Sequence, residues 1–279
     1  MRNIFNNMRH QKDLNSNGYT ILNFLDDEKF KSLVQLYEII KGNETTAGTN
    51  KNTYELSFFE KNVQSKKDKF NAMYNFLKPV IDEVLNDYIP IMVNLFNKEK
   101  GLGEVPIHQN WTFVDEDIYT SVSLWIPLQD VNRENGTLEI VPGSQKVVCK
   151  YRGPSIPWVF DELNDLLKKK YMVPIEIKRG QAVILDDSVI HYSGLNNIDI
   201  PRRAIQVILK PRESQLIHCY QNDKNLIEIL DVEDDYFFDF NMWEKPKEGL
   251  RKKIKEIYLP KLNEDQLTKL CFQNICSNL

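Results

Sequence analysis

The feature that most constrains the fold is a run of short apolar segments between roughly residues 89 and 211. Stretches rich in Val, Ile, Leu, Trp and Tyr alternate there with clusters of turn-forming residues. That pattern is typical of an all-β sandwich or barrel. The pair Asn135-Gly136 predicts a tight type I′ hairpin turn, because both residues tolerate positive φ values. The predicted strands are residues 105–114, 119–128, 136–141, 173–178, 181–185, 189–193 and 202–209.

Helices are predicted on both sides of this β region. Apolar residues recur at helical spacing in 27–40 and again in 70–85, so two helices are expected to cover a sheet. A short helix is predicted at 160–169, and further helices at 248–258 and 264–276. Because no repeat or long polar linker divides the chain, we expect one domain. It would comprise a cover (1–104), a β core (105–211) and a C-terminal helical extension (212–279).

Composition excludes several classes of function and names none. The 279 residues are 42% hydrophobic and carry a formal net charge of −4, which gives no electrostatic reason to bind nucleic acid or an anionic membrane. No apolar run approaches the ~18 residues that cross a bilayer, and the N-terminus has no apolar signal segment. We therefore expect a cytoplasmic protein with free thiols. Its cysteines form no CxxC pair, and they are Cys149, Cys219, Cys271 and Cys276.

Strand alternation predicts a barrel with an apolar outside and a mixed, partly polar inside. Successive side chains of a strand point to opposite faces, so every second residue shares an environment. The predicted outer set is Val122, Leu124, Ile126 and Leu128 with Ile205, Val207 and Leu209. The predicted inner set is Ser121, Ser123 and Trp125 with Arg202, Ala204 and Gln206. Such an interior would hold a ligand under an exterior covered by helices.

Two of the four histidines stand in an order typical of a metal site. His108 and Asn110 share a predicted strand face, His191 follows much later, and Arg202 comes soon after it. The order H-x-D, long gap, H, then R is the sequence form of the 2-His-1-carboxylate site of non-haem Fe(II) oxygenases. The arginine fork would hold the distal carboxylate of 2-oxoglutarate. The other histidines, His10 in a polar N-terminal segment and His218, are expected to be structural, and an indirect or turn role is expected for Asp186 and Asp187.

The stretch from Ile107 to Leu209 resembles the phytanoyl-CoA dioxygenase family of Fe(II)/2-oxoglutarate oxygenases. IHQNW is similar to its HQDW-type motif, and SLWIPLQDVNRENGTLEIVPGSQK resembles its W-x-x-L-x-D, NG-x-L and VPGSH-K run. HYSGLNNIDIPRRA resembles its distal motif, and GYTILNFLDDEKF its usual opening. The resemblance implies a mainly β fold, a double-stranded β-helix (a cupin-like jelly roll) with flanking N- and C-terminal α-helices.

The same resemblance implies a site and a reaction. The protein would use Fe(II), 2-oxoglutarate and O2 to hydroxylate an unactivated C–H bond of a small-molecule or carrier-linked substrate. Residues 43–60, residues 149–158 and the C-terminal helices would select that substrate. The sequence does not fix the oligomeric state. The implied roles are iron ligation by His108, Asn110 and His191; carboxylate binding by Arg202 and Ser193; a pocket wall at Trp125; and a cofactor contact at Gln109.

One departure from the family pattern bears on all of these roles. Asn110 stands where the family has the Asp ligand, and a neutral amide does not offset the charge of the iron as a carboxylate does. Asn110 could ligate weakly in a working oxygenase, which we favour. It could mark an open coordination position, as in the related halogenases, or an impaired site in a cupin-like binding protein. A smaller departure is Gln145, in place of a common histidine, which is expected to affect only a surface turn.

Overall fold

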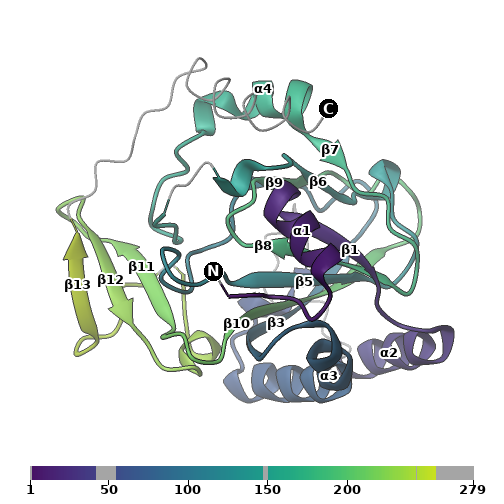
Figure 1. Cartoon of the computed structure of the whole chain (residues 1–279), viewed down its shortest axis with the longest axis horizontal. Helices are drawn as coiled ribbons and strands as arrows, with labels where there is room; N and C mark the ends of the chain where they lie inside the picture. Colours follow the sequence, from purple (N-terminus) through teal and green to yellow (C-terminus); the bar gives the residue numbers. More distant parts are fainter. Residues whose placement is uncertain (1, 42–54, 147–149, 243, 256–279) are drawn as a thin grey trace.

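Two antiparallel sheets facing one another form the centre of the molecule (Figure 1). The computed structural model describes residues 2–41, 55–146, 150–242 and 244–255. The larger sheet has the order β1 (Tyr19–Asn23), β8 (Gln181–Asp186), β5 (Val122–Pro127), β10 (Arg202–Pro211), β3 (Tyr88–Lys98) and β2 (Glu55–Leu56). The smaller has the order β4 (Val105–His108), β9 (His191–Ser193), β6 (Leu138–Ile140) and β7 (Val173–Pro174). The predicted fold class, a mainly β double-stranded β-helix, is confirmed.

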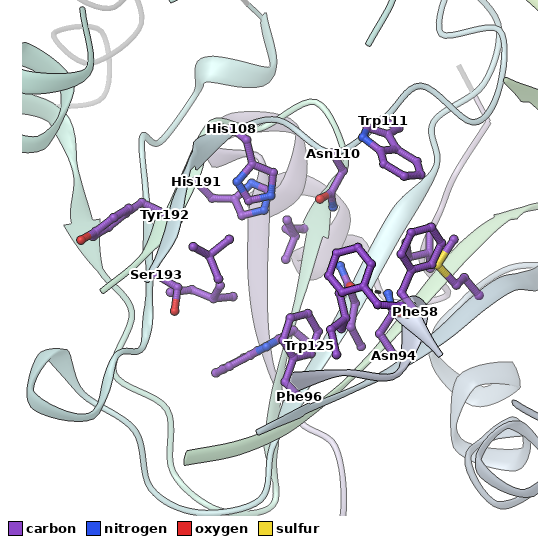
Figure 2. Close-up of a pocket in the computed structure, with 18 of the residues that line it drawn as sticks. Phe58, Asn94, Phe96, His108, Asn110, Trp111, Trp125, His191, Tyr192 and Ser193 are labelled. Atoms are coloured by element: carbon purple, nitrogen blue, oxygen red, sulfur yellow. Dashed lines mark hydrogen bonds between the residues drawn. The ribbon is translucent and has the colours of Figure 1, made fainter. Parts of the chain in front are cut away.

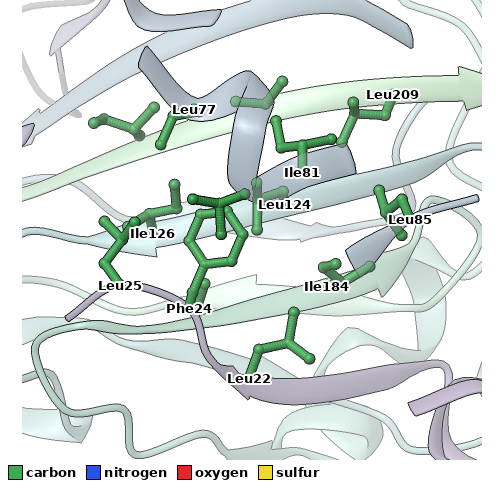
Figure 3. Close-up of a cluster of buried hydrophobic side chains, with 14 of the residues drawn as sticks. Leu22, Phe24, Leu25, Leu77, Ile81, Leu85, Leu124, Ile126, Ile184 and Leu209 are labelled. Atoms are coloured by element: carbon green, nitrogen blue, oxygen red, sulfur yellow. The ribbon is translucent and has the colours of Figure 1, made fainter. Parts of the chain in front are cut away.

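Helices cover the outer face of the larger sheet, as the apolar stripes predicted. They are α2 (Asp27–Ile40) and α3 (Val63–Val84), and the side chain of Asp26 caps α2 by accepting from the Lys29 N–H. Leu77 and Ile81 of α3 pack on Leu124 and Ile126 of β5 in the main hydrophobic cluster (Figure 3). Each such side chain contributes about 1.5–3 kcal/mol by burial. The sheet is thereby closed to water on this side, and its free face is the one turned to the smaller sheet.

The predicted inner and outer faces of the strands are confirmed. Every predicted outer residue of β5 and β10, and Leu128 just beyond β5, belongs to the cluster under the helices. On the inner face, Trp125 and Ala204 pack instead against Leu138 and Ile140 of the smaller sheet. Two-residue alternation along β5 and β10 therefore assigns each side chain to one of two cores. The interior between the sheets is where the remaining polar inner residues lie.

The N-terminal segment is more ordered than its polar sequence suggested. Residues Met8–Asn17 form helix α1, which the side chain of Asn7 caps by accepting from the Arg9 N–H. His10 lies in this helix, with its Nδ1 2.9 Å from the Thr20 hydroxyl of β1. Its expected structural role agrees with that contact. Gln145 also contacts α1, through hydrogen bonds to the carbonyls of Leu14 and Asn15, so the turn that carries it is fastened to this helix.

The hairpin turn predicted at Asn135-Gly136 is wrong. Residues Arg133–Asn135 form a 3-10 helix, and only Gly136 has a positive φ, of 72°. The flanking strands β5 and β6 belong to different sheets, so the connection crosses between layers instead of folding back. Glycine is required at 136 for a second reason. A Cβ there would lie 2.5 Å from the carbonyl oxygen of Gly194, next to the strand that carries His191.

The helical extension predicted after residue 211 is also wrong where the structure describes it. β11 (Ile217–Gln221), β12 (Ile227–Asp231) and β13 (Arg251–Lys255) form a third antiparallel sheet. The expected helix at 248–258 overlaps β13, whose five residues pair with β12. Short amphipathic runs fit either period, and pairing with a neighbouring strand decides between them. The helix expected at 264–276 lies outside the described residues.

Three short helical elements follow one another between residues 161 and 171. A 3-10 turn (Asp161–Leu163), α4 (Asn164–Leu166) and a π-helical turn (Leu167–Tyr171) confirm the short helix predicted at 160–169. Cys219 is buried, and the other three cysteines lie outside the described residues. Within the described ranges, no helix combines the length and apolar character needed to cross a membrane.

Candidate functional site

A cavity of about 240 Å³ lies between the two sheets and collects most of the residues singled out by the sequence (Figure 2). Strands β4 and β9 form one wall, and β3, β5 and β10 form the other. Because inner-facing residues of both sheets meet here, the site lies inside the fold. Its lining includes His108, Asn110, Trp125, His191, Ser193 and Arg202, as predicted, together with Asn94, Trp111 and Gln206.

The two histidines lie side by side at the smaller sheet. His108 of β4 is paired with His191 of β9, and their ring centroids are 4.1 Å apart. His108 Nδ1 is 2.7 Å from the Pro106 carbonyl, and His191 Nδ1 is 2.9 Å from the Val189 carbonyl. A carbonyl accepts only from a protonated nitrogen, so Nδ1 carries the proton and Nε2 keeps a lone pair. Metal-binding histidines are oriented in this way.

Burial keeps both imidazoles in the form that binds metal. It lowers the pKa of His108, and it lowers the pKa of His191 well below the usual value, with His108 adding to the effect. A neutral imidazole offers a lone pair, whereas an imidazolium does not. The pair is therefore ready to coordinate a cation at neutral pH without first losing protons.

Asn110 supplies the third donor beside the histidines. Strand β4 ends at His108, earlier than predicted, and Asn110 reaches the cavity from the segment after it. Its Nδ2 donates to Ser123 Oγ at 3.0 Å and to Asp187 Oδ1 at 2.8 Å, and its side chain also contacts His108. With both N–H groups engaged, the carbonyl Oδ1 is the atom turned to the histidine. The two imidazole rings and the amide side chain thus lie together at this end of the cavity.

No carboxylate joins this set of donors. Across residues 2–41, 55–146, 150–242 and 244–255, no group of three His, Cys, Asp or Glu side chains is arranged to hold a metal ion. The nearest acid is Asp187, which is fully buried and also accepts from Ser123 Oγ at 2.6 Å. Burial raises the pKa of Asp187 to about 6, against hydrogen bonds from Ser123, Ser121 and Asn110 that lower it. Asp186 has the expected turn role, because its carboxylate accepts from the Ser188 N–H and hydroxyl.

Two buried basic side chains lie at the other end of the cavity. Arg202 of β10 is 2% exposed, and its register partner Lys98 of β3 is fully buried. Arg202 Nη2 donates to Ser193 Oγ at 3.3 Å, while its Nε and Nη1 have no partner. Lys98 Nζ lies 2.6 Å from Ser193 Oγ and donates to the Gly194 carbonyl at 2.9 Å. The guanidinium stands 5.5 Å from the ring centroid of Trp125.

These basic side chains form no ion pair within the described residues, which favours the binding of an anion at this end of the cavity. Neither Arg202 nor Lys98 forms an ion pair with a described carboxylate. Burial lowers the pKa of Lys98 to about 5, with the neighbouring Arg202 adding to the effect, and it lowers the pKa of Arg202 to about 9. A bound carboxylate would relieve both costs. Sequence analysis missed Lys98, because a lysine at a strand end is ordinarily exposed.

Arg203 and Gln109 lie outside the cavity. Arg203 pairs with Glu38 of α2 on the outer face, so the choice of Arg202 as the inner arginine agrees with the structure. Gln109 is buried and donates to the Ser188 carbonyl, and it does not line the cavity. The structure therefore does not bring Gln109 to the site, as the predicted cofactor contact requires. Trp111, expected to share the face of Gln109, lines the cavity instead because β4 ends before it.

The remaining wall is aromatic. The Phe58 ring centroid lies 5.6 Å from that of Trp111 (Figure 2). Behind them, the Phe240 ring centroid lies 5.7 Å from that of Trp111. Of the predicted substrate-selecting segments, 43–60 contributes Leu56, Phe58 and Phe59, whereas described residues 150–158 do not reach the lining. Residues 43–54, Cys149 and the helix at 264–276 lie outside the described residues. A polar chain crosses this wall, from Asn94 Nδ2 to Gln206 Oε1 (3.0 Å) and from Gln206 Nε2 to Ser123 Oγ (3.2 Å).

Comparison with known proteins agrees with this geometry. The sequence profile of phytanoyl-CoA dioxygenase (PhyH) matches residues 14–204. Phytanoyl-CoA dioxygenase 1 of Oryza sativa is 34% identical over 113 residues, which are 39% of this chain and 40% of that protein. A phytanoyl-CoA dioxygenase domain-containing protein 1 homolog of Dictyostelium discoideum is 30% identical over 147 residues, 50% of this chain and 52% of that protein. The chain thus matches about half or less of the length of these curated relatives.

Solved structures share the fold at low sequence identity. The non-heme alpha ketoglutarate dependent carbocyclase SnoK from nogalamycin biosynthesis superposes with a TM-score of 0.56 at 14% identity, covering 75% of this chain and 86% of that one. EvdO2 from Micromonospora carbonacea, complexed with 2-oxoglutarate, gives 0.51 at 21% identity, covering 74% and 91%. Because the family profile spans more than half of the sequence, the chain belongs to the phytanoyl-CoA dioxygenase family.

Proposed function

We propose that this protein is an Fe(II)/2-oxoglutarate-dependent dioxygenase that hydroxylates a predominantly apolar small molecule. The observation that carries the proposal is the pairing, within one cavity, of a cluster of neutral donors with an anion site that has no counter-ion. A divalent metal and a dicarboxylate are the two ligands that these opposite ends would take. Among solved structures of the same fold, HygX from Streptomyces hygroscopicus has nickel and 2-oxoglutarate bound, and the epimerase SnoN is in complex with Fe3+ and alpha ketoglutarate.

The donor set fits iron. His108 and His191 would bind through Nε2, since their Nδ1 protons are held by backbone carbonyls. Asn110 would add its Oδ1, giving two imidazole ligands and one oxygen ligand on one side of the metal. Bound iron would supply the activation of O2 and of the keto acid that an unactivated C–H bond requires. Hydrogen bonds already hold the two rings and the amide in place, so little rotamer entropy is lost when the metal binds.

The anion site fits the distal carboxylate of 2-oxoglutarate. Arg202 has two buried nitrogens without partners, Nε and Nη1, whose N–H groups are available to donate to a carboxylate. Ser193 lies between Arg202 and Lys98 and adds a hydroxyl. Lys98 does not line the cavity, so it would act by holding Ser193 and by adding positive charge. Trp125 closes the site over the guanidinium.

The aromatic wall points to an apolar substrate. Arg202 is the one charged side chain among the described lining residues, and the proposal commits it to the co-substrate. The rest of the wall is Phe58, Phe59, Phe96, Trp111, Phe113, Met92 and Met242, with the amides of Asn94 and Gln206 as its polar points. Binding there would exclude water from the reacting carbon. A carrier-linked substrate would have to place its polar carrier outside this cavity.

The halogenase alternative is less well supported by the geometry. An open coordination position for a halide requires a small residue, whereas the Asn110 amide fills this position and is held by two hydrogen bonds. An experiment can distinguish the impaired, non-catalytic alternative from an active oxygenase. It predicts that a dicarboxylate still binds at Arg202 while no metal complex forms.

The test is anaerobic titration of the protein with Fe(II) and 2-oxoglutarate. We expect the weak visible charge-transfer absorption of the chelate, followed by succinate release when O2 is added. His191→Ala should remove both signals, and His10→Ala, which removes a histidine outside the cavity, should leave them unchanged. Absence of both signals in the unaltered protein and in Asn110→Asp would contradict the proposal, and dependence of the absorption on chloride would favour the halogenase.

A further inference from the structure

The amide of Asn110 is held by a buried carboxylate. Asp187 Oδ1 accepts from Asn110 Nδ2 at 2.8 Å and from Ser123 Oγ at 2.6 Å, and Asn110 Nδ2 also donates to that serine. The three side chains therefore form a closed triangle of hydrogen bonds behind the donor atoms. Asp187 comes from the turn after β8, and Ser123 from the neighbouring strand β5. Both are thus held by the larger sheet, Ser123 within a strand and Asp187 directly after one.

This contact decides which end of the amide faces the histidines. A carboxylate only accepts hydrogen bonds, so it meets the NH2 group of Asn110 and repels its carbonyl oxygen. The carbonyl must then point towards His108. The distinction matters for metal binding, since the amide nitrogen has no available lone pair and only Oδ1 can coordinate. Without an acceptor at position 187, both orientations of the amide would be open.

The carboxylate also brings charge. Asp187 is fully buried, and it forms no ion pair with any described lysine or arginine. Arg152 is the cation that acts on it electrostatically, and the guanidinium of Arg152 is already paired with Glu116, at 2.9 Å from Nη1 to Oε2. Taking a charge out of water without a partner is costly. A divalent cation bound to the other side of Asn110 would provide that partner across one amide group.

We propose that Asp187 is a positioning residue that takes over, one hydrogen bond away, the negative charge that Asn110 does not supply as a ligand. The inference rests on the proposed function, because it concerns the same metal site. The proposal also predicts that the residues at positions 110 and 187 can be exchanged for one another. An aspartate at 110 with an asparagine at 187 would preserve the hydrogen bond with donor and acceptor exchanged, whereas two aspartates would place like charges in contact.

The test measures metal affinity without turnover, by titrating the metal-free protein with Co(II). Asp187→Asn is expected to weaken Co(II) binding at least tenfold, because the charge is lost and an amide at 187 can meet either end of the Asn110 amide. Asn110→Asp alone is expected to gain less than the exchanged pair, since its new carboxylate faces Asp187. The double variant Asn110→Asp/Asp187→Asn is expected to bind Co(II) at least as tightly as the unaltered protein. Asp186→Asn, which makes the same change at the neighbouring carboxylate that bonds to Ser188 instead of Asn110, serves as the matched control and should change the affinity less than threefold.

Two further readouts separate a positioning role from damage to the fold. The visible spectrum of bound Co(II) should change in Asp187→Asn and return in the double variant, and thermal unfolding of the metal-free variants should show that they are folded. Wild-type affinity in Asp187→Asn would overturn the inference, as would a double variant no better than Asp187→Asn. Failure of the unaltered protein to bind Co(II) would overturn both this inference and the proposed function, whereas normal binding with no effect of Asp187→Asn would overturn this inference alone.

Discussion

The two ends of the cavity are built on opposite electrostatic principles. At the smaller sheet, His108, His191 and Asn110 are neutral and their hydrogen-bonding groups are satisfied by neighbours. At the larger sheet, Arg202 is a buried cation with two nitrogens that lack partners, and Lys98 beside it is a buried amine whose lowered pKa leaves it neutral at pH 7. The first end is oriented in advance for a ligand at little cost to the free protein. The second end destabilises the free protein, and it gains most when its ligand arrives.

This difference predicts that the two ends respond separately to substitution. A ligand-binding group that is already satisfied controls geometry, whereas one that lacks a partner controls affinity through charge. Changes at the histidine end should therefore weaken metal binding and have little effect on dicarboxylate affinity. Changes at the cation end should do the reverse. Four substitutions, from the largest expected effect to the smallest, test the separation.

His191→Ala should have the largest effect, and on metal affinity. Loss of residues that merely orient a ligand costs roughly 10–100-fold, so loss of the imidazole itself should exceed about 100-fold. Titration of the metal-free protein with Co(II) measures it. His10→Ala is the control, because His10 contacts Thr20 on the far side of β1. Co(II) affinity within tenfold of the unaltered protein would place the metal somewhere other than between the two histidines.

Arg202→Met should come next, with its effect on 2-oxoglutarate. Removing one member of a buried, hydrogen-bonded charge pair costs about 2–5 kcal/mol, so dicarboxylate affinity should fall roughly 100-fold or more while Co(II) affinity changes little. Isothermal titration with 2-oxoglutarate in the presence of Co(II) measures the loss. Arg203→Met is a closely matched control, because that neighbouring arginine faces outward to Glu38. Equal losses in the two variants would show that the predicted inner and outer faces do not govern binding.

Lys98→Met should have a smaller effect that depends on pH. Burial lowers the pKa of Lys98 to about 5 in the free protein, so the amine is neutral at pH 7. A bound carboxylate favours the protonated amine and raises this pKa, so binding takes up a proton. Affinity should therefore weaken as pH rises from 7 to 8.5, by at most about tenfold per pH unit. Titrations in buffers of different ionisation enthalpy count the protons.

The same substitution supplies the control for that pH dependence. Lys98→Met should bind 2-oxoglutarate roughly tenfold more weakly at pH 7, and its affinity should be nearly flat across this range. Lowered pKa values keep both cavity histidines neutral throughout, so they contribute no slope. A flat profile in the unaltered protein would show that Lys98 is already charged before the anion binds.

Predictability from sequence also differs between regions of the molecule. The β core and its two faces could be predicted because alternation in β5 and β10 is strict and each face has its own apolar partner. The sheet formed by β11, β12 and β13 could not, since its strands are short and β13 fits helical spacing as well. Lys98 was missed as a member of the site, and Asp187 was expected only in an indirect or turn role, for a related reason. Their roles come from register pairing with Arg202 and from a turn that meets Asn110, which are contacts between distant segments.

Gln109→Leu should have the smallest effect on ligand affinity. It tests whether residue 109 belongs to the metal-binding end of the cavity. The resemblance to the family gives Gln109 a cofactor contact, whereas the structure turns its side chain away to the Ser188 carbonyl. We expect 2-oxoglutarate and Co(II) affinities within about twofold of the unaltered protein. The free energy of unfolding should fall by about 1 kcal/mol, the usual net contribution of one hydrogen bond. Thermal unfolding and the two titrations measure these quantities on one sample. A tenfold loss of 2-oxoglutarate affinity at unchanged stability would instead require Gln109 to turn into the cavity on binding, which would extend the metal end to residue 109.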